Sequence, residues 1–195
     1  MNWKLILFVL LISFGAYQHF SQRPVTYGNG VITKQEPAQL TTNQANFSIN
    51  NYTIRPLESF QIEARVLSAT HYLIGRESDL SPVDLALGWG RMSDEAILKD
   101  VDISQSNRFY YWHVDHFPIP REEIETHSAN MHMIPADNQI EKQLKSVRVG
   151  QVVSIKGELV EVSAPDGWHW KSSLTRNDTG QGACELVYVK EITLK

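Results

Sequence analysis

The fold is decided by residues 149–189, which read VGQVVSIKGELVEVSAPDGWHWKSSLTRNDTGQGACELVYV. Residues 152–162 largely alternate between apolar and polar side chains, as a strand with one buried face does. Residues 165–167 (Pro-Asp-Gly) are a turn sequence, and the aromatic run at 168–170 begins a returning strand. After a polar loop, residues 184–189 supply another β-prone apolar run. This stretch predicts part of a small antiparallel barrel or sandwich.

The flanking sequence adds strands and a few short helices. Residues 60–66 (FQIEARV) alternate cleanly, and residues 108–112 (RFYYW) are typical of a strand. Ser-Pro-Val-Asp at 81–84 has the form of a helix start, and Ser-Asp-Glu at 93–95 predicts a second short helix. Residues 137–146 predict an amphipathic helix. The expected class is therefore α+β, with a dominant antiparallel sheet.

The first twenty residues differ in character from the rest. Lys4 precedes a dozen apolar or small residues without charge, at 5–16. We expect a hydrophobic helix that acts as an uncleaved signal anchor; a cleaved signal peptide is the alternative. A single-pass anchor with Lys4 on its short side places the N-terminus in the cytoplasm and exports the rest. The expected organisation is an anchor at 1–20, a polar linker at 21–44 and one globular β-rich domain at 45–195.

Composition excludes some classes of function. The formal net charge is −4 and the 18 Lys and Arg residues are scattered, so no nucleic-acid partner is expected. The lone cysteine, Cys184, excludes an intrachain disulfide and a multi-cysteine zinc site.

Three blocks of sequence carry a resemblance. They are SPVDLALGWGRMSD (81–94), HSANMHMIPAD (127–137) and DGWHWKSSLTRNDTGQGACE (166–185). These blocks resemble the signatures of an uncharacterised family of bacterial membrane-anchored or envelope proteins, over roughly residues 65–189. The resemblance implies a bacterial inner-membrane protein whose domain faces the periplasm or the cell exterior, and it transfers no catalytic role. Separately, residues 149–189 look like part of an oligonucleotide/oligosaccharide-binding barrel.

Histidines in the middle of the chain are the first candidates for chemistry. His127, His132 and Asp137 offer imidazole and carboxylate ligands of the kind that transition metals use. His127 and His132 are five residues apart, which fits neither one face of a helix nor alternation in a strand. The favoured interpretation is structural hydrogen bonding by a polar loop, so no metal and no cofactor is assigned.

Cys184 is a second catalytic candidate. With His132 or His169 it has the residue types of a thiolate–imidazolium pair for acyl transfer, and the backbone of residues 180–183 would supply amides to an oxyanion. Cys184 also begins an alternating strand, where a small buried residue is expected. We favour the buried thiol over the nucleophile.

The polar loop at 172–180 is the preferred binding element. Arg176 is expected to hold an anionic group, with Asp178 beside it, and Trp168 or Trp170 to stack on a sugar or base. Trp89, between two glycines, is a further ligand-binding candidate, although a core position is favoured for it. If the loop only binds, Arg176→Ala should weaken binding and barely change the melting temperature.

Three classes of function remain open. The sequence favours a non-catalytic, membrane-tethered extracytoplasmic module that binds an envelope protein or a glycan. The alternatives are a metal-dependent or cysteine hydrolase of the cell envelope, with His127, His132 and Cys184 as candidate catalytic residues, and a structural subunit of a membrane complex.

Overall fold

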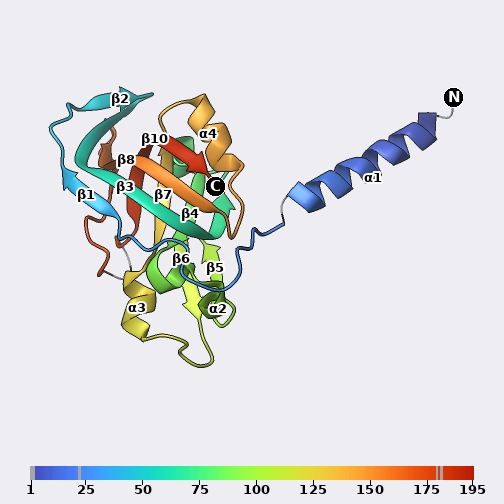
Figure 1. Ribbon diagram of the computed structural model, residues 1–195. Coiled ribbons are helices and arrows are strands. Elements are labelled where there is room, and N and C mark those ends of the chain that lie inside the picture. Colours follow the sequence, from blue (N-terminus) through green and yellow to red (C-terminus); the bar gives the residue numbers. More distant parts are fainter. Residues whose placement is uncertain (1–2, 22, 179, 181) are drawn as a thin grey trace.

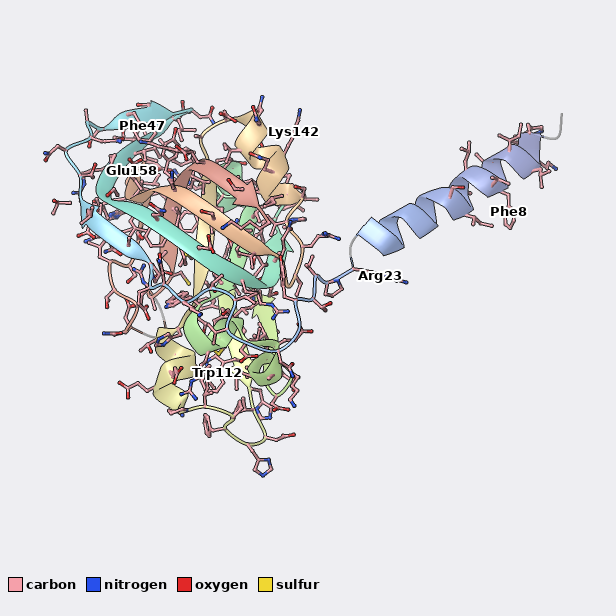
Figure 2. The ribbon with its side chains drawn as sticks, viewed as in Figure 1. Phe8, Arg23, Phe47, Trp112, Lys142 and Glu158 are labelled. Atoms are coloured by element: carbon pink, nitrogen blue, oxygen red, sulfur yellow. The ribbon has the colours of Figure 1, made fainter. Side chains whose placement is uncertain are left out.

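The computed structural model describes residues 3–21, 23–178, 180 and 182–195. Helix α1 (Trp3–Ser21) stands apart from the β-rich body formed by the rest of the chain (Figure 1). Apolar side chains of α1, among them Trp3, Leu5 and Phe8, are more than half exposed (Figure 2). Within the described residues, no helix combines the length and the apolar character needed to cross a membrane.

One large sheet dominates the body. Its strands are β1 (Ala38–Thr41), β2 (Phe47–Ile49), β3 (Tyr52–His71), β4 (Val83–Gly88), β7 (Ser128–Pro135), β8 (Val152–Ser163), β9 (His169–Lys171) and β10 (Glu185–Leu194). β3 pairs with β4, β4 with β7, β7 with β10 and β10 with β8, and β8 returns to β3. The pairing of these five strands therefore closes into a ring. Only the β7–β10 pair is parallel among them, so the expected antiparallel-rich α+β class is confirmed.

The length of β3 allows the ring to close. Its residues 53–65 pair with β8, and its residues 65–71 pair with β4. Register shifts occur between Pro56 and Glu58 against β8, and between Val66 and Ser68 against β4. Such irregularities bend a strand and increase its twist, which lets one strand serve two neighbours.

Alternate residues of the five strands build the main core. The buried cluster includes Ile62, Ala64, Leu85, Leu87, Met131, Met133, Val153, Ile155, Val187 and Val189. Helix α4 (Asn138–Lys145) packs Ile140 and Leu144 onto this cluster. Asp137 caps α4, because its Oδ1 accepts from the amides of Gln139 and Ile140 at 2.7 and 2.9 Å. The amphipathic helix expected at 137–146 is therefore confirmed.

The helix expected to start at Ser81 is wrong, because residues 83–88 form strand β4. All six residues of β4 are buried, so the apolar run belongs to a strand covered on both faces. Asp84 does not cap a helix; its carboxylate contacts Arg108 and His132. The second short helix is confirmed as α2 (Glu95–Leu98), with the Asp94 side chain accepting from the Ala96 amide.

A two-stranded hairpin covers the outer side of β4. It consists of β5 (Asp102–Ser106) and β6 (Phe109–His113), and Asn107 and Arg108 turn with positive φ angles of 51° and 69°. Two consecutive positive φ values define a tight two-residue hairpin turn. With helix α3 (Arg121–Thr126), the hairpin forms the lower part of the body, where Trp112 is seen (Figures 1 and 2).

The N-terminal segment, residues 25–36, is docked along the body. The Val25 amide donates to Val149 O at 2.9 Å, and the Gly30 amide donates to the Asp94 carboxylate at 2.8 Å. Farther on, the Glu36 carboxylate accepts from the Trp89 indole at 2.6 Å. Strand β1 then pairs with β3. Much of the segment expected as a linker, from Val25 through β1, therefore contacts the β-rich body.

Candidate functional site

A cavity of about 600 Å³ lies between β6, α3 and the loop that precedes β10. Its wall is aromatic, with Tyr111, Trp112 and Phe117 on the hairpin side. Across from them stand Arg176, Asp178, Cys184 and Glu185. A volume of this order is ordinary for a small-molecule or peptide site.

Arg176 and Glu185 form a buried ion pair at this cavity. Arg176 Nε lies 2.8 Å from Glu185 Oε1, and the two side chains are only 13% and 1% exposed. The Arg176 guanidinium also lies 5.7 Å from the Phe60 ring centroid. Burial raises the pKa of Glu185 to about 8, although Arg176 acts in the opposite direction.

This ion pair has unused hydrogen-bonding capacity. Within the described part of the chain, none of the three guanidinium nitrogens of Arg176 makes a well-aligned hydrogen bond, and neither carboxylate oxygen of Glu185 does. A buried polar group without a partner costs free energy, and native structures seldom leave one at a purely structural position. The pair is therefore the strongest indication of a ligand in this cavity.

Asp178 also lines the cavity but is held by its own loop. Its Oδ2 accepts from Ser173 Oγ at 2.7 Å, and the same hydroxyl contacts Thr175 O at 3.0 Å. The structure thus brings Arg176 and Asp178 to one cavity, as the binding-loop hypothesis requires. It also gives Arg176 a structural partner that the sequence analysis did not foresee.

Cys184 lines the cavity, and the hydrogen-bonding contacts of its thiol in the described part of the chain are to Asn130 and Arg108. Its Sγ contacts the Asn130 side chain at 3.6 Å and Arg108 O at 3.8 Å. Burial raises the pKa of the thiol to about 11, which is opposite to the shift that activates a nucleophilic cysteine. The oxyanion hypothesis included residue 181, which lies outside the described residues. The buried-thiol interpretation fits this environment better.

His132 belongs to a separate buried cluster with Asp84 and Arg108. Asp84 is fully buried; its Oδ1 lies 2.7 Å from Arg108 Nη1 and its Oδ2 lies 3.0 Å from His132 Nδ1. The second contact is at ion-pair distance but poorly aligned for a hydrogen bond. Trp170 packs on the His132 ring with centroids 4.8 Å apart. The cluster ties β4, β7, the hairpin turn and β9 together.

Trp168 and Trp170 are not among the residues that line the Arg176 cavity. The guanidinium of Arg76 lies 4.7 Å from the Trp168 ring centroid, and Arg76 pairs with Asp166 through two hydrogen bonds of 2.6 and 2.9 Å. Trp168 and Trp170 pack edge to face at 6.0 Å. These two rings therefore pack on each other and on Arg76 and His132, and the cavity that Arg176 lines has its aromatic wall from other residues.

Trp89 and His127 share one carboxylate. Glu36 Oε2 accepts from Trp89 Nε1 at 2.6 Å, and Glu36 Oε1 lies 3.0 Å from His127 Nε2. Trp89 is 0% exposed, which is the core position favoured for it from the sequence. His127 directly follows α3 and contacts Glu36, whereas His132 contacts Asp84. The two histidines therefore have different partners.

The candidate metal ligands are not brought together. Asp137 is occupied in capping α4, while His127 contacts Glu36 and His132 contacts Asp84. Within residues 3–21, 23–178, 180 and 182–195, no group of three or more His, Cys, Asp and Glu side chains is arranged to hold a metal ion.

Sequence reasoning missed two parts of the cavity. The aromatic residues of β6 were recognised as a strand and not as the wall of a site, and Glu185 was taken as part of an apolar run. The available signal was a charged residue entering that run directly after Cys184, since an unpaired buried carboxylate is rarely tolerated. Arg176, nine residues earlier, is a predicted binding residue, but the sequence does not indicate that it pairs with Glu185.

Comparison with known proteins adds no further identification. No family model, no curated protein and no solved structure matches this chain.

Proposed function

We propose that the protein is a non-catalytic, membrane-tethered extracytoplasmic binding module whose ligand occupies the cavity between β6, α3 and the loop before β10. The observation that carries the proposal is the Arg176–Glu185 pair, whose buried polar atoms have no aligned hydrogen bond to any described residue and lie beside an aromatic wall. A concave site with a few convergent polar groups is the usual form of a binding site.

The order of pairing supports an oligonucleotide/oligosaccharide-binding type of barrel. Five strands close into a ring, and helix α4 lies between the third and fourth of them. Folds of this type bind ligands on their second and third strands, with help from the loop between the fourth and fifth. Here these elements are β4, β7 and the β8–β10 connection, which carries Arg176 and Asp178.

Helix α1 supports the tether. The large apolar side chains at 3 and 5–12 are exposed, and Lys4 lies near the start of the helix. A bilayer is a medium in which such a helix loses its exposed apolar surface, with the N-terminus cytoplasmic. Flotation of the full chain with lipid vesicles, and its loss when residues 3–16 are deleted, would test this attachment.

The two alternative classes fit the contacts less well. A hydrolase based on His127, His132 and Cys184 needs these groups near each other, and each has different partners. A structural subunit of a membrane complex needs no cavity with unused polar groups. An envelope protein or a glycan therefore remains the class of partner that we propose, without a nucleic acid.

Filling the cavity tests the proposal. Ala183 lines the cavity, so Ala183→Trp should occupy it, and Leu73→Trp is the matched control because Leu73 is 87% exposed in the β3–β4 connection. The full chain in lipid nanodiscs is screened by ligand-observed NMR against a set of oligosaccharides and a set of short peptides. Compounds that bind the wild type and Leu73→Trp but not Ala183→Trp would support the proposal. Failure of both sets to bind, or equal binding to all three proteins, would overturn it.

A further inference from the structure

Within the residues that the structure describes, strand β6 pairs with β5 along one edge and with no strand along the other. β5 and β6 form a sheet of two strands, and their register runs from Ser106 against Phe109 to Asp102 against His113. A strand edge without a neighbour exposes backbone N–H and C=O groups that another extended chain can pair with. The position of this edge therefore matters for what the cavity can bind.

The cavity borders that unpaired edge. Residues 109–114 all line it in unbroken succession, whereas no residue of β5 does. A strand that turned one face to a cavity would contribute only every second residue, because side chains alternate between faces. Residues 128–130 of β7 also line it in succession, before β10 begins to pair with β7 at Met131. The cavity thus follows the edges of β6 and β7, where backbone N–H and C=O groups lie.

Hairpin geometry identifies the backbone groups on this edge. In a two-residue hairpin, the pair next to the turn is hydrogen-bonded, and hydrogen-bonded pairs then recur at every second position. Ser106 and Phe109 flank the turn, so the amides of Phe109, Tyr111 and His113 point toward β5. The amides of Tyr110 and Trp112 therefore point away from β5, toward the unpaired edge.

The opposite wall suits a neutral polar group. Arg176 offers donors and Glu185 offers acceptors, and neither side chain has an aligned hydrogen bond within the described residues. An amide accepts from a guanidinium and donates to a carboxylate, so it satisfies both members of the pair. An amide is also uncharged, so it adds no charge to a buried site, where an unpaired charge is costly.

We infer that the ligand of this cavity is an extended peptide segment of another protein, which adds to β6 as a third strand and places an amide or hydroxyl side chain against Arg176 and Glu185. This inference rests on the proposed function and names its ligand class. Strand addition uses backbone hydrogen bonds for affinity and alternate side chains for specificity. Side chains on one face of the peptide would meet Arg176 and Glu185, and the aromatic wall would contact its flanks.

Two hydrogen bonds fix the β5–β6 hairpin against β7. Tyr110 Oη donates to Ser128 Oγ at 3.2 Å, and Asn130 Nδ2 donates to Arg108 O at 2.9 Å. These contacts fix β6 relative to β7 before any ligand arrives. A preformed edge reduces the ordering entropy that the complex must overcome.

A displayed library of random decapeptides, selected on the full chain in nanodiscs, supplies the probe. The best synthetic peptide is then methylated at each backbone nitrogen in turn. Loss of binding at every second position, by about tenfold or more for each lost hydrogen bond, is expected of strand addition. In hydrogen exchange, the peptide should slow the amides of Tyr110 and Trp112 and leave those of Phe109 and Tyr111 unchanged, because the latter already bond to β5.

Variants of the chain complete the test. Val114 lines the cavity directly after β6, two residues beyond Trp112. Val114→Pro should therefore remove the next backbone donor along this edge and weaken peptide binding about tenfold. Val114→Ala keeps the donor and should bind within about threefold of the wild type. Peptide binding without period-two sensitivity and without selective protection would overturn strand addition. Binding of oligosaccharides alone would also overturn it while leaving the proposed function intact, and binding of neither class would remove both.

Discussion

Arg176 Nε lies 2.8 Å from Glu185 Oε1, and this contact joins the loop before β10 to the first residue of that strand. The pair is at once part of the cavity wall and part of the fold. The expectation that Arg176→Ala would barely change the melting temperature is therefore replaced by a different one, because truncation would leave Glu185 buried without its cation.

We predict that Arg176→Ala lowers the free energy of unfolding by roughly 1–3 kcal/mol, the cost of leaving a buried polar group unpaired. Above about pH 8, where Glu185 is a carboxylate, the double variant Arg176→Ala/Glu185→Gln should recover part of that loss, because the buried carboxylate is then gone. Arg55→Ala is the control, since Arg55 is half exposed in its pair with Glu161 and exposed pairs contribute little. Urea unfolding of all variants measures this; an Arg176→Ala effect no larger than that of Arg55→Ala would contradict it.

The second prediction concerns pH. Burial raises the pKa of Glu185 from its ordinary 4.5 to about 8 in the folded chain, so between these values the folded state binds more protons than the unfolded state. The free energy of unfolding should therefore decrease as the pH rises from about 4.5 to about 8. Glu185→Gln should remove this part of the decrease. Chemical unfolding at half-unit pH intervals gives the difference between the two curves, and parallel curves would show that Glu185 has an ordinary pKa.

Much of the strand content was predictable from local pattern. Residues 152–162 alternate, and β8 occupies Val152–Ser163; the helix of 137–146 showed both its cap and its apolar face. Strand β4 could not be predicted in this way, because the side chains of a strand buried on both faces do not alternate between apolar and polar. The ring closure was hidden as well, since it depends on β3 pairing with both β4 and β8.

The site was predictable only in part. Arg176 and Asp178 were found because a polar loop between strands is a common location for binding residues. Trp168 and Trp170 are close to them in sequence, but Trp170 packs on His132 and Trp168 packs on Arg76. Sequence proximity could not reveal that the aromatic wall comes instead from β6, some sixty residues earlier. That contact depends on the hairpin folding back over the outer side of β4.

Cys184 should react slowly with thiol reagents. Burial raises its pKa to about 11, and only the thiolate is a nucleophile. At neutral pH the folded chain should react with iodoacetamide roughly a hundredfold more slowly than a free cysteine of ordinary pKa. The urea-unfolded chain is the internal control and should react at the ordinary rate. Fast reaction of the folded chain would favour the cysteine hydrolase alternative.

Asp84 should be a major contributor to stability. It is fully buried and lies 2.7 Å from Arg108 Nη1 and 3.0 Å from His132 Nδ1. Asp84→Ala should lower the free energy of unfolding by roughly 3–5 kcal/mol, because Arg108 is then left partly buried without its anion. Asp166→Ala removes a carboxylate that is 60% exposed in its pair with Arg76 and should change stability little. Calorimetry on both variants compares the two directly, and equal effects would contradict the assigned role of the buried cluster.

The last prediction tests the docking of the N-terminal segment. Gly150 has a φ of +81°, and a Cβ there would lie 2.0 Å from the carbonyl oxygen of Val25. Gly167 has a φ of +88° with no atom within 4 Å of such a Cβ. Both Gly→Ala changes place a side chain in the left-handed region, at a cost of roughly 1–2 kcal/mol. Gly150→Ala should cost more, because it also displaces Val25 and the hydrogen bond from its amide to Val149 O.

Urea unfolding and limited proteolysis distinguish the two effects. Gly150→Ala should unfold at lower urea than Gly167→Ala, and a protease should cut its residues 25–36 sooner, because the docked segment is released before the ring of strands unfolds. Gly167→Ala should keep the wild-type cleavage pattern, since its turn is distant from the segment in sequence and has open space around it. Equal stabilities and identical cleavage patterns would mean that the segment contributes nothing to the folded body, and that the domain begins at β1.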